Sequence, residues 1–179
     1  MTEKNVGKVV GVNGNLLAVR FDGDVSMNEI CFVHVDGASL KSEVIRIHGK
    51  VAQVQVYEMT DGIRCGDAVE FTGEMLSAQL GPGLLGQIYD GLQNPLPALA
   101  EQAGWFLERG IYADALDGGK RWDFTPVARL GAVLRAGEVL GTVPERAFTH
   151  KIFVPFHLLG NYTLKSIAEP GAYTIHETI

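Results

Sequence analysis

Short runs in which hydrophobic and polar residues alternate fill the first 72 positions of the chain. In residues 51–58, Val54 and Val56 alternate with polar neighbours, as expected of a strand with one face turned to a core. Asn13-Gly14 supplies the left-handed turn of a tight hairpin. The pattern predicts six strands, at residues 6–12, 16–21, 29–35, 42–48, 51–58 and 68–72.

Six short strands at near-even spacing, with no helical pattern among them, indicate a small closed barrel. Closure is favoured because an open sheet of this size would expose unpaired edges. The predicted fold is therefore mainly β. It comprises an N-terminal six-stranded barrel at 1–72, a glycine- and proline-rich hinge segment at 73–94, and a short helix followed by a β insertion at 95–179.

The hinge segment contains a literal G-x-G-x-x-G at Gly81, Gly83 and Gly86. In a dinucleotide-binding fold the third glycine opens a helix whose N-terminus holds a pyrophosphate. Here Gly91 and Pro95 follow too soon for such a helix. The motif is therefore predicted to be a turn-rich connection and not a dinucleotide site.

Residues 95–109 carry apolar residues at spacings of three and four, which predicts an amphipathic helix that Gly104 weakens or ends. Asp117-Gly118-Gly119-Lys120 is predicted to be an exposed turn. It is not a phosphate loop, because Asp114 and Arg121 stand where that motif needs glycine and Ser or Thr. Three aromatic residues are expected to pack in a core or between domains: Trp105, Phe106 and Trp122.

From Phe124 onward the chain is predicted to be β again, with similar glycine turns at 135–140, 169–174 and, in the first half, 64–69. This arrangement resembles the barrel-sandwich of lipoyl and biotinyl domains, which raises a carrier hypothesis. A carrier needs a lysine at the tip of a hairpin. The tip is expected at 144–148, whereas the nearest lysine, Lys151, lies in a predicted strand.

Composition excludes several classes of function. With 15 basic and 21 acidic residues the net charge is −6, and the basic residues are scattered, so nucleic-acid binding is not expected. No apolar run approaches the roughly twenty residues that span a bilayer, and no signal-peptide core is present, which favours a cytoplasmic protein.

The residues with metal or redox chemistry are few and isolated. Cys31 and Cys65 are expected to be buried thiols, since they form no C-x-x-C pair. His34 and His48 lie in or beside predicted strands without a second histidine at a ligand spacing, so packing or surface roles are expected. No catalytic, cofactor-binding or metal-binding residue is predicted.

The order of several motifs resembles the catalytic A subunit of V-type and archaeal-type ATPases and ATP synthases. The similarity is carried by Leu80-Gly81-Pro82-Gly83-Leu84-Leu85 running into Ile88-Tyr89-Asp90-Gly91-Leu92. It continues through Trp122–Pro126, Gly141–Glu145, His150–Pro155 and Tyr173–Ile175, and so covers nearly the entire chain.

This resemblance implies a barrel that joins a hexameric ring of alternating A and B subunits, and an insertion near the peripheral stalk, with a central stalk as a further partner. It implies Mg-ATP as the cofactor of the whole subunit, in the soluble sector of an enzyme that transports protons or sodium. The family's phosphate loop has no counterpart here, because no G-x-x-x-x-G-K-[ST] occurs, so this chain is expected to be inactive alone. The alternative is a separate adaptor or carrier module without catalysis.

Overall fold

The computed structural model describes residues 5–104 and 108–179. Contacts divide the chain into two units. The barrel unit comprises residues 1–78 and 99–112, and the second unit comprises residues 79–98 and 113–179. Residues 79–98 thus group with the β structure that follows them, and 99–112 group with the barrel. Independent folding of the barrel sequence 1–72 stays a prediction.

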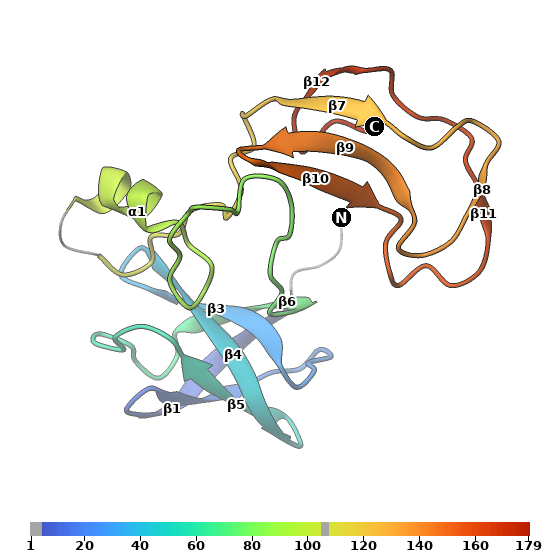
Figure 1. The fold of residues 1–179 in the computed structure, drawn as a ribbon. Helices are drawn as coiled ribbons and strands as arrows, with labels where there is room; N and C mark the ends of the chain where they lie inside the picture. The colour runs from blue at the N-terminus through green and yellow to red at the C-terminus, as the bar shows by residue number, and fades with distance from the viewer. Residues whose placement is uncertain (1–4, 105–107) are drawn as a thin grey trace. The chain divides into compact units, whose positions relative to one another are not determined.

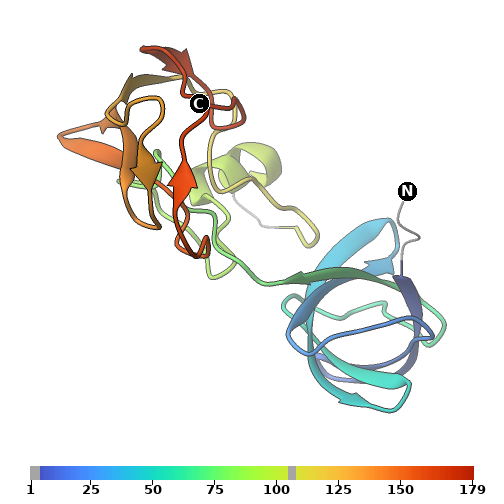
Figure 2. The same ribbon diagram turned by 90° about the vertical axis from the view of Figure 1, so that its right-hand side faces the viewer.

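Six antiparallel strands close the barrel (Figures 1 and 2). Around the barrel they follow the order β1, β2, β5, β4, β3 and β6, and the pairing of β1 with β6 completes the closure, so no strand of the barrel has a free edge. Their bounds are β1 Asn5–Asn13, β2 Leu16–Arg20, β3 Glu29–Val35, β4 Ala38–His48, β5 Val51–Val56 and β6 Ala68–Met75.

The closed barrel predicted from the sequence is confirmed, and the largest difference in strand length is at β4. β4 begins at Ala38, four residues before the predicted start. Asp36 and Gly37 both adopt positive φ, at 47° and 86°, and form a tight turn that returns the chain at once, so His34 pairs with Ser39. Polar residues near the turn concealed this part of the strand in the hydrophobic pattern.

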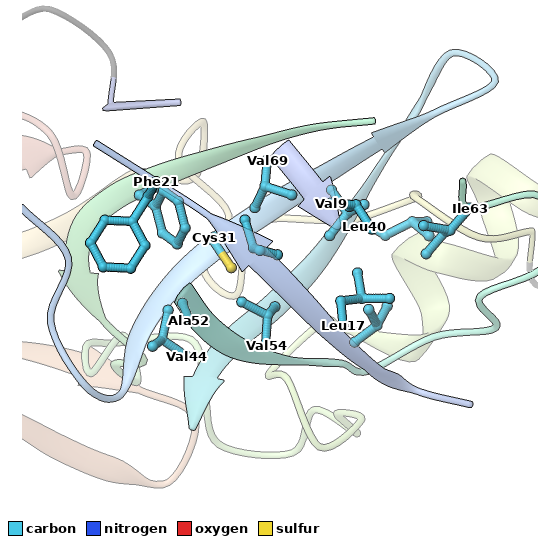
Figure 3. Packing of buried hydrophobic residues seen from close by; sticks show 14 of the residues in the cluster. Val9, Leu17, Phe21, Cys31, Leu40, Val44, Ala52, Val54, Ile63 and Val69 are labelled. Atoms are coloured by element: carbon cyan, nitrogen blue, oxygen red, sulfur yellow. The ribbon is translucent and has the colours of Figure 1, made fainter. Parts of the chain in front are cut away.

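Apolar side chains from alternate positions along the strands fill the barrel interior (Figure 3). On β5 the alternation is complete, because Ala52, Val54 and Val56 are buried while the residues between them are half-buried. This confirms the predicted inward face. Other strands supply Leu17, Val19, Cys31, Val33, Leu40, Val44, Val69 and Phe71, all buried.

One carboxylate is also buried in the barrel unit. Glu29, only 3% exposed, accepts hydrogen bonds from the amides of Ser26 at 2.8 Å and Gly73 at 2.6 Å. A buried acid is costly unless its oxygens are satisfied, and these two amides satisfy one oxygen each. Glu29 therefore ties the start of β3 to the end of β6.

Residues 109–112, here called the strap, pack on the barrel. The Tyr112 hydroxyl accepts a hydrogen bond from the Lys41 amide at 2.6 Å and donates one to Glu58, which also accepts the Gly110 amide at 2.7 Å. The Tyr112 ring meets Phe32 edge-on, with centroids 6.3 Å apart. The strap is thus fixed by both polar and aromatic contacts.

A single helix, α1 Leu96–Ala103, is present among the described residues. It is shorter than the predicted 95–109. Gly104 ends it with φ +73° and donates its amide to Ala100, a C-terminal arrangement that glycine adopts without strain. The expected packing of Trp105 and Phe106 lies outside the described residues.

The second unit contains a four-stranded antiparallel sheet in the order β10, β9, β7 and β12, and a two-stranded sheet of β11 and β8. Trp122, Phe124 and Val143 form its buried core, so the packing role predicted for Trp122 is confirmed. The strands are β7 Trp122–Pro126, β8 Val133–Leu134, β9 Val139–Glu145, β10 Phe148–Phe153, β11 Tyr162–Thr163 and β12 Gly171–Tyr173.

Two of the predicted glycine turns share one geometry. In Arg64-Cys65-Gly66-Asp67 and Arg135-Ala136-Gly137-Glu138, the acid accepts the arginine amide, at 2.7 and 2.6 Å, and returns its own amide to the arginine carbonyl. Each glycine has positive φ. Cys65, the second residue of the first turn, is exposed, so the prediction that it is buried was wrong, whereas Ala136 at the same position of the other turn is half-buried. For Cys31 the prediction is confirmed.

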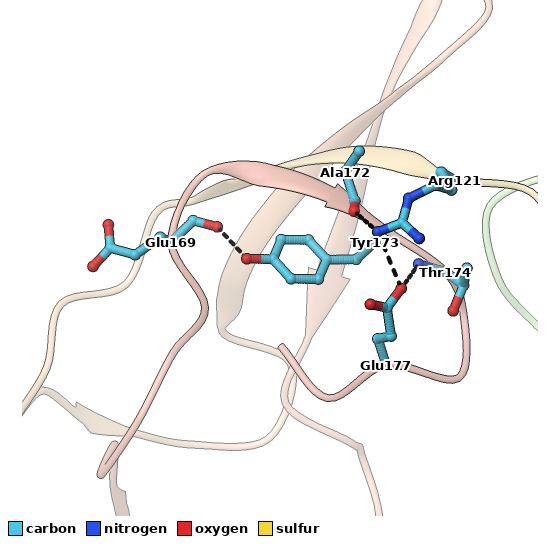
Figure 4. Close-up of polar contacts among 6 residues, drawn as sticks. All are labelled: Arg121, Glu169, Ala172, Tyr173, Thr174 and Glu177. Carbon is cyan, nitrogen blue, oxygen red and sulfur yellow. Dashed lines mark hydrogen bonds and ion pairs between the residues drawn. The ribbon is translucent and has the colours of Figure 1, made fainter.

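A polar network fixes the C-terminal part of the second unit (Figure 4). Arg121 donates to the Ala172 carbonyl and lies 3.6 Å from Glu177, whose carboxylate also accepts the Thr174 amide at 2.6 Å. The Thr174 hydrogen bonds are the main cause that lowers the pKa of Glu177 below its usual value. The network holds the residues after β12 against β7.

Candidate functional site

The glycine loop, residues 81–86, carries the G-x-G-x-x-G spacing and is predicted from the sequence to be a turn-rich connection and not a dinucleotide site. It contains no helix, and the next regular element, α1, begins ten residues after Gly86 at Leu96. Gly83 and Gly86 have φ values of +111° and +79°. The loop therefore lacks the strand–turn–helix frame of a dinucleotide site, as predicted.

The amides of the glycine loop nevertheless bind an anion, which is a side chain of the same unit. Glu145 Oε1 accepts hydrogen bonds from the amides of Gly83 at 2.6 Å and Leu85 at 3.2 Å. Its other oxygen lies 2.9 Å from His150 Nδ1. Glu145 is only 2% exposed, so both oxygens are satisfied by the protein.

The electrostatics of Glu145 favour the carboxylate form. Burial alone would raise its pKa, but the hydrogen bonds from Gly83, Leu85 and His150 together lower the pKa below its usual value. Glu145 in turn raises the pKa of the Tyr89 hydroxyl, after burial, which is the larger cause. Glu145 is thus an ionised carboxylate that hydrogen-bond donors surround.

At each of the three glycines, any larger residue would bring its Cβ atom close to a neighbouring side chain. A Cβ at Gly81 would lie 2.9 Å from the Leu116 side chain, one at Gly83 3.3 Å from Trp122, and one at Gly86 2.6 Å from the Arg146 guanidinium. The three positions are therefore glycine because other residues of the second unit pack closely against their backbone.

The residues after the glycine loop are anchored in a similar way. The Asp90 carboxylate accepts the amides of Leu92 and Asn94 at 2.9 and 2.8 Å, and the buried Asn94 accepts the Ala113 amide at 3.2 Å. The Tyr89 hydroxyl donates to the Ala115 carbonyl at 2.9 Å. Asp90 thus shapes a turn that Asn94 and Tyr89 fasten to the chain leading into β7.

An open, mainly apolar groove of about 970 Å³ also lies in the second unit. Its lining includes Pro82, Trp122, His150, Ile152 and Ile175. The Trp122 indole nitrogen is buried and has no hydrogen-bond partner among the described residues. Charged and polar side chains also line the groove, among them Asp114, Lys151 and Glu177.

The hairpin between β9 and β10 corresponds to the tip expected of a carrier. Its turn consists of Arg146 and Ala147, and Lys151 lies within β10, paired with Thr142 of β9. Lys151, the lysine nearest to the hairpin tip, therefore lies within a strand and not at the tip, where a carrier attaches its cofactor.

The two histidines of the barrel strands differ in their surroundings. His34 Nδ1 lies 2.9 Å from the Ser39 hydroxyl and its Nε2 lies 3.5 Å from Glu70, while His48 is exposed at the end of β4. Across residues 5–104 and 108–179, no three His, Cys, Asp or Glu side chains gather as a metal site would require. Within these ranges no helix has the length and apolar character needed to cross a membrane.

The pairing of Glu145 with the glycine loop was not predicted, although the sequence contains a signal for it. On β9, Gly141, Val143 and Glu145 occupy alternate positions and are all buried. In a strand, alternate residues share a face. An acid that continues the inward face of a strand indicates a buried carboxylate with specific partners.

Comparison with known protein families gives two matches. Residues 9–73 match the β-barrel domain of the ATP synthase alpha/beta family, and residues 113–179 match the barrel-sandwich domain of ATP synthase alpha/beta subunits. The first match covers most of the closed barrel. The second covers the whole of the second unit after the glycine loop and α1.

Comparison with individual proteins finds V-type ATP synthase alpha chains. The chain is 60% identical to that of Treponema denticola over 176 residues, 53% identical to alpha chain 1 of Treponema pallidum over 173, and 52% identical to that of Borrelia hermsii over 173. These alignments include 97–98% of this chain but only 29–30% of each relative. The chain therefore spans about three tenths of the length of the relatives it matches.

Proposed function

Because the chain belongs to the ATP synthase alpha/beta family and is homologous to the N-terminal part of V-type ATP synthase alpha chains, we propose that it is the N-terminal region of the catalytic subunit of a V-type rotary ATPase or ATP synthase. The observation that carries the proposal is 60% identity over 98% of the chain. The identity extends through both domains, so it covers more than a shared barrel fold.

In this proposal the whole subunit binds Mg-ATP and couples its hydrolysis or synthesis to proton or sodium transport, while this region serves assembly. The sequence contains no phosphate loop, and the amides of its glycine loop are bonded to Glu145. The barrel joins B subunits and further A subunits in the ring, and the second unit contacts a stalk. The subunit then belongs to the soluble sector on the cytoplasmic side of a membrane.

The exposed surface of the structure supports an assembly role. Because the barrel is closed, a partner would bind its side-chain surface and not an open strand edge. The second unit also exposes large apolar side chains, including Phe148 at 66%, Phe156 at 74% and Leu159 at 86%. Apolar residues of this size on a surface are typical of contacts with other proteins.

The experiment compares the full-length subunit with a version that lacks residues 1–72, each co-expressed with the B subunit. We expect the full-length protein to form a ring that hydrolyses ATP and the shortened protein to fail in ring formation. A shortened protein that assembles normally would contradict the assembly role of the barrel.

The chain of 179 residues is tested separately for nucleotide binding. Calorimetric titration should detect no binding of Mg-ATP tighter than about millimolar, because no phosphate loop is present. Micromolar binding would contradict the assignment of the nucleotide site to another part of the subunit. Light scattering should show mainly monomers, since a ring of unlike subunits needs the complementary face of the other chain.

A further inference from the structure

The glycine loop and Glu145 form an anion site that is complete within the second unit. Two amides, from Gly83 and Leu85, point to the same carboxylate oxygen, at 2.6 and 3.2 Å. Backbone amides that converge in a turn form an anion-binding nest, whether the anion is a phosphate or a carboxylate. The glycine loop, which is not expected to bind a dinucleotide, thus binds an internal anion.

The β9–β10 hairpin places two basic side chains beside this nest. His150 on β10 contacts the second Glu145 oxygen at 2.9 Å, and the Arg146 guanidinium packs directly on Gly86. Tyr89, whose pKa Glu145 raises, is the other titratable neighbour. The Arg146 guanidinium and the hydrogen bond from His150 therefore favour an anion at this position.

Several contacts of the loop do not involve Glu145. Gly81 packs on Leu116 and Gly83 packs on Trp122, and the Gln87 amide closes a turn on the Leu84 carbonyl at 3.2 Å. The amides should therefore keep their orientation when the carboxylate is absent. A nest that persists without its occupant would be open to an external anion.

We propose that residues 81–86 form an anion-binding loop whose resident ligand is the Glu145 carboxylate, and that removal of this side chain opens a site for a small carboxylate such as formate. The Glu145 carboxylate holds the loop against the β9–β10 hairpin through these hydrogen bonds. It also occupies the site, so free phosphate and free carboxylates do not bind the unmodified protein there.

The test uses the 179-residue chain with Glu145→Ala and follows the Gly83 and Leu85 amides by NMR hydrogen exchange. We expect exchange of both amides to accelerate about tenfold or more, because a hydrogen bond to a charged acceptor is lost. Formate should restore their protection and chemical shifts in a saturable manner, and chloride at equal ionic strength should not. The unmodified protein should show no change with formate or inorganic phosphate.

Glu138→Ala is the matched control. Glu138 also accepts a backbone amide, from Arg135 at 2.6 Å, but it does so within its own exposed turn. Formate should leave the Gly83 and Leu85 amides of this variant unchanged. An equal response to formate in this variant, in the unmodified protein and in Glu145→Ala would overturn the proposal.

Glu145→Gln provides the second variant, since it keeps the size of the side chain and removes its charge. We expect partial protection of the two amides and no response to formate, because the amide still fills the site. The proposal is also overturned if Glu145→Ala exchanges like the unmodified protein, or if both variants lose the β9–β10 sheet, since the carboxylate would then be inseparable from the fold.

Discussion

The ring of Phe124 on β7 lies directly against the backbone of Gly141 on β9. A Cβ built on Gly141 would fall 2.2 Å from the ring carbon Cε2 and 2.8 Å from the Thr125 carbonyl oxygen. Neither the ring, buried at 2% exposure, nor the paired strand can move away without disturbing the core of the second unit.

Replacement of this glycine should therefore destabilise the second unit. We expect Gly141→Ala to lower the free energy of unfolding by about 1–3 kcal/mol, the usual cost of overpacking a core. Gly91→Ala is the control, because a Cβ at Gly91 meets no atom within 4 Å. Chemical denaturation of both variants gives the comparison, and equal stability of the two would contradict the packing argument.

The barrel core offers a matched pair of valines. Val33 on β3 is fully buried, whereas Val6 on β1 is 51% exposed. Val33→Ala should cost roughly 2 kcal/mol, since it removes two buried carbon atoms and leaves a cavity. Val6→Ala should change stability by less than about 0.5 kcal/mol. Similar losses in the two variants would show that residues 5–75 do not pack around the interior described.

The strap should make stability depend on alkaline pH. Burial, and then the hydrogen bond to Glu58, raise the pKa of Tyr112 above its ordinary value of 10.0. Above pH 10 the unfolded chain loses this proton while the folded protein retains it, so stability is full below pH 10 and falls as the pH rises toward the folded pKa. Tyr112→Phe should lessen this fall.

At neutral pH the same variant should be less stable by about 1–2 kcal/mol, because the Lys41 amide loses its acceptor. Thermal or denaturant unfolding from pH 7 to 11 measures both effects. The exposed Tyr162, replaced by Phe, serves as the control and should leave the pH profile unchanged. A Tyr112→Phe profile parallel to that of the unmodified protein would contradict the role of the hydroxyl.

Residues 1–80 alone are expected to unfold cooperatively, since all six barrel strands and nearly all of their buried side chains lie within them. This piece lacks the strap, so it should be less stable than the barrel in the full chain. Denaturation followed by circular dichroism tests both statements. A gradual loss of signal without a transition would show that the barrel needs residues 99–112 for its core.

The strands could be predicted because their signal is local. Alternation of apolar and polar residues and a glycine turn such as Asn13-Gly14 specify both the strand and its inward face, and the structure follows them closely. The sequence predicted a helix over 95–109 that Gly104 weakens or ends, and in the structure the helix ends before Gly104. The turn at 64–67 was also found, but the exposure of Cys65 depends on which way that turn projects its second residue.

The buried acids could not be predicted in this way. Glu29 and Glu145 each accept two backbone amides, and the partners of Glu145 lie about sixty positions earlier in the chain. An acid on an inward position looks unfavourable until these partners are known. The glycine loop differs, because its sequence predicted a turn-rich connection, and only the fold shows that its amides bind the Glu145 carboxylate.

The chain crosses between the two units three times, after residues 78, 98 and 112. A protease that cuts at any one of these crossings leaves at least one fragment with segments of both units. The two fragments should therefore elute together from a gel-filtration column and separate only under denaturing conditions. A single break in the backbone at a crossing can thus pass unnoticed in the native protein.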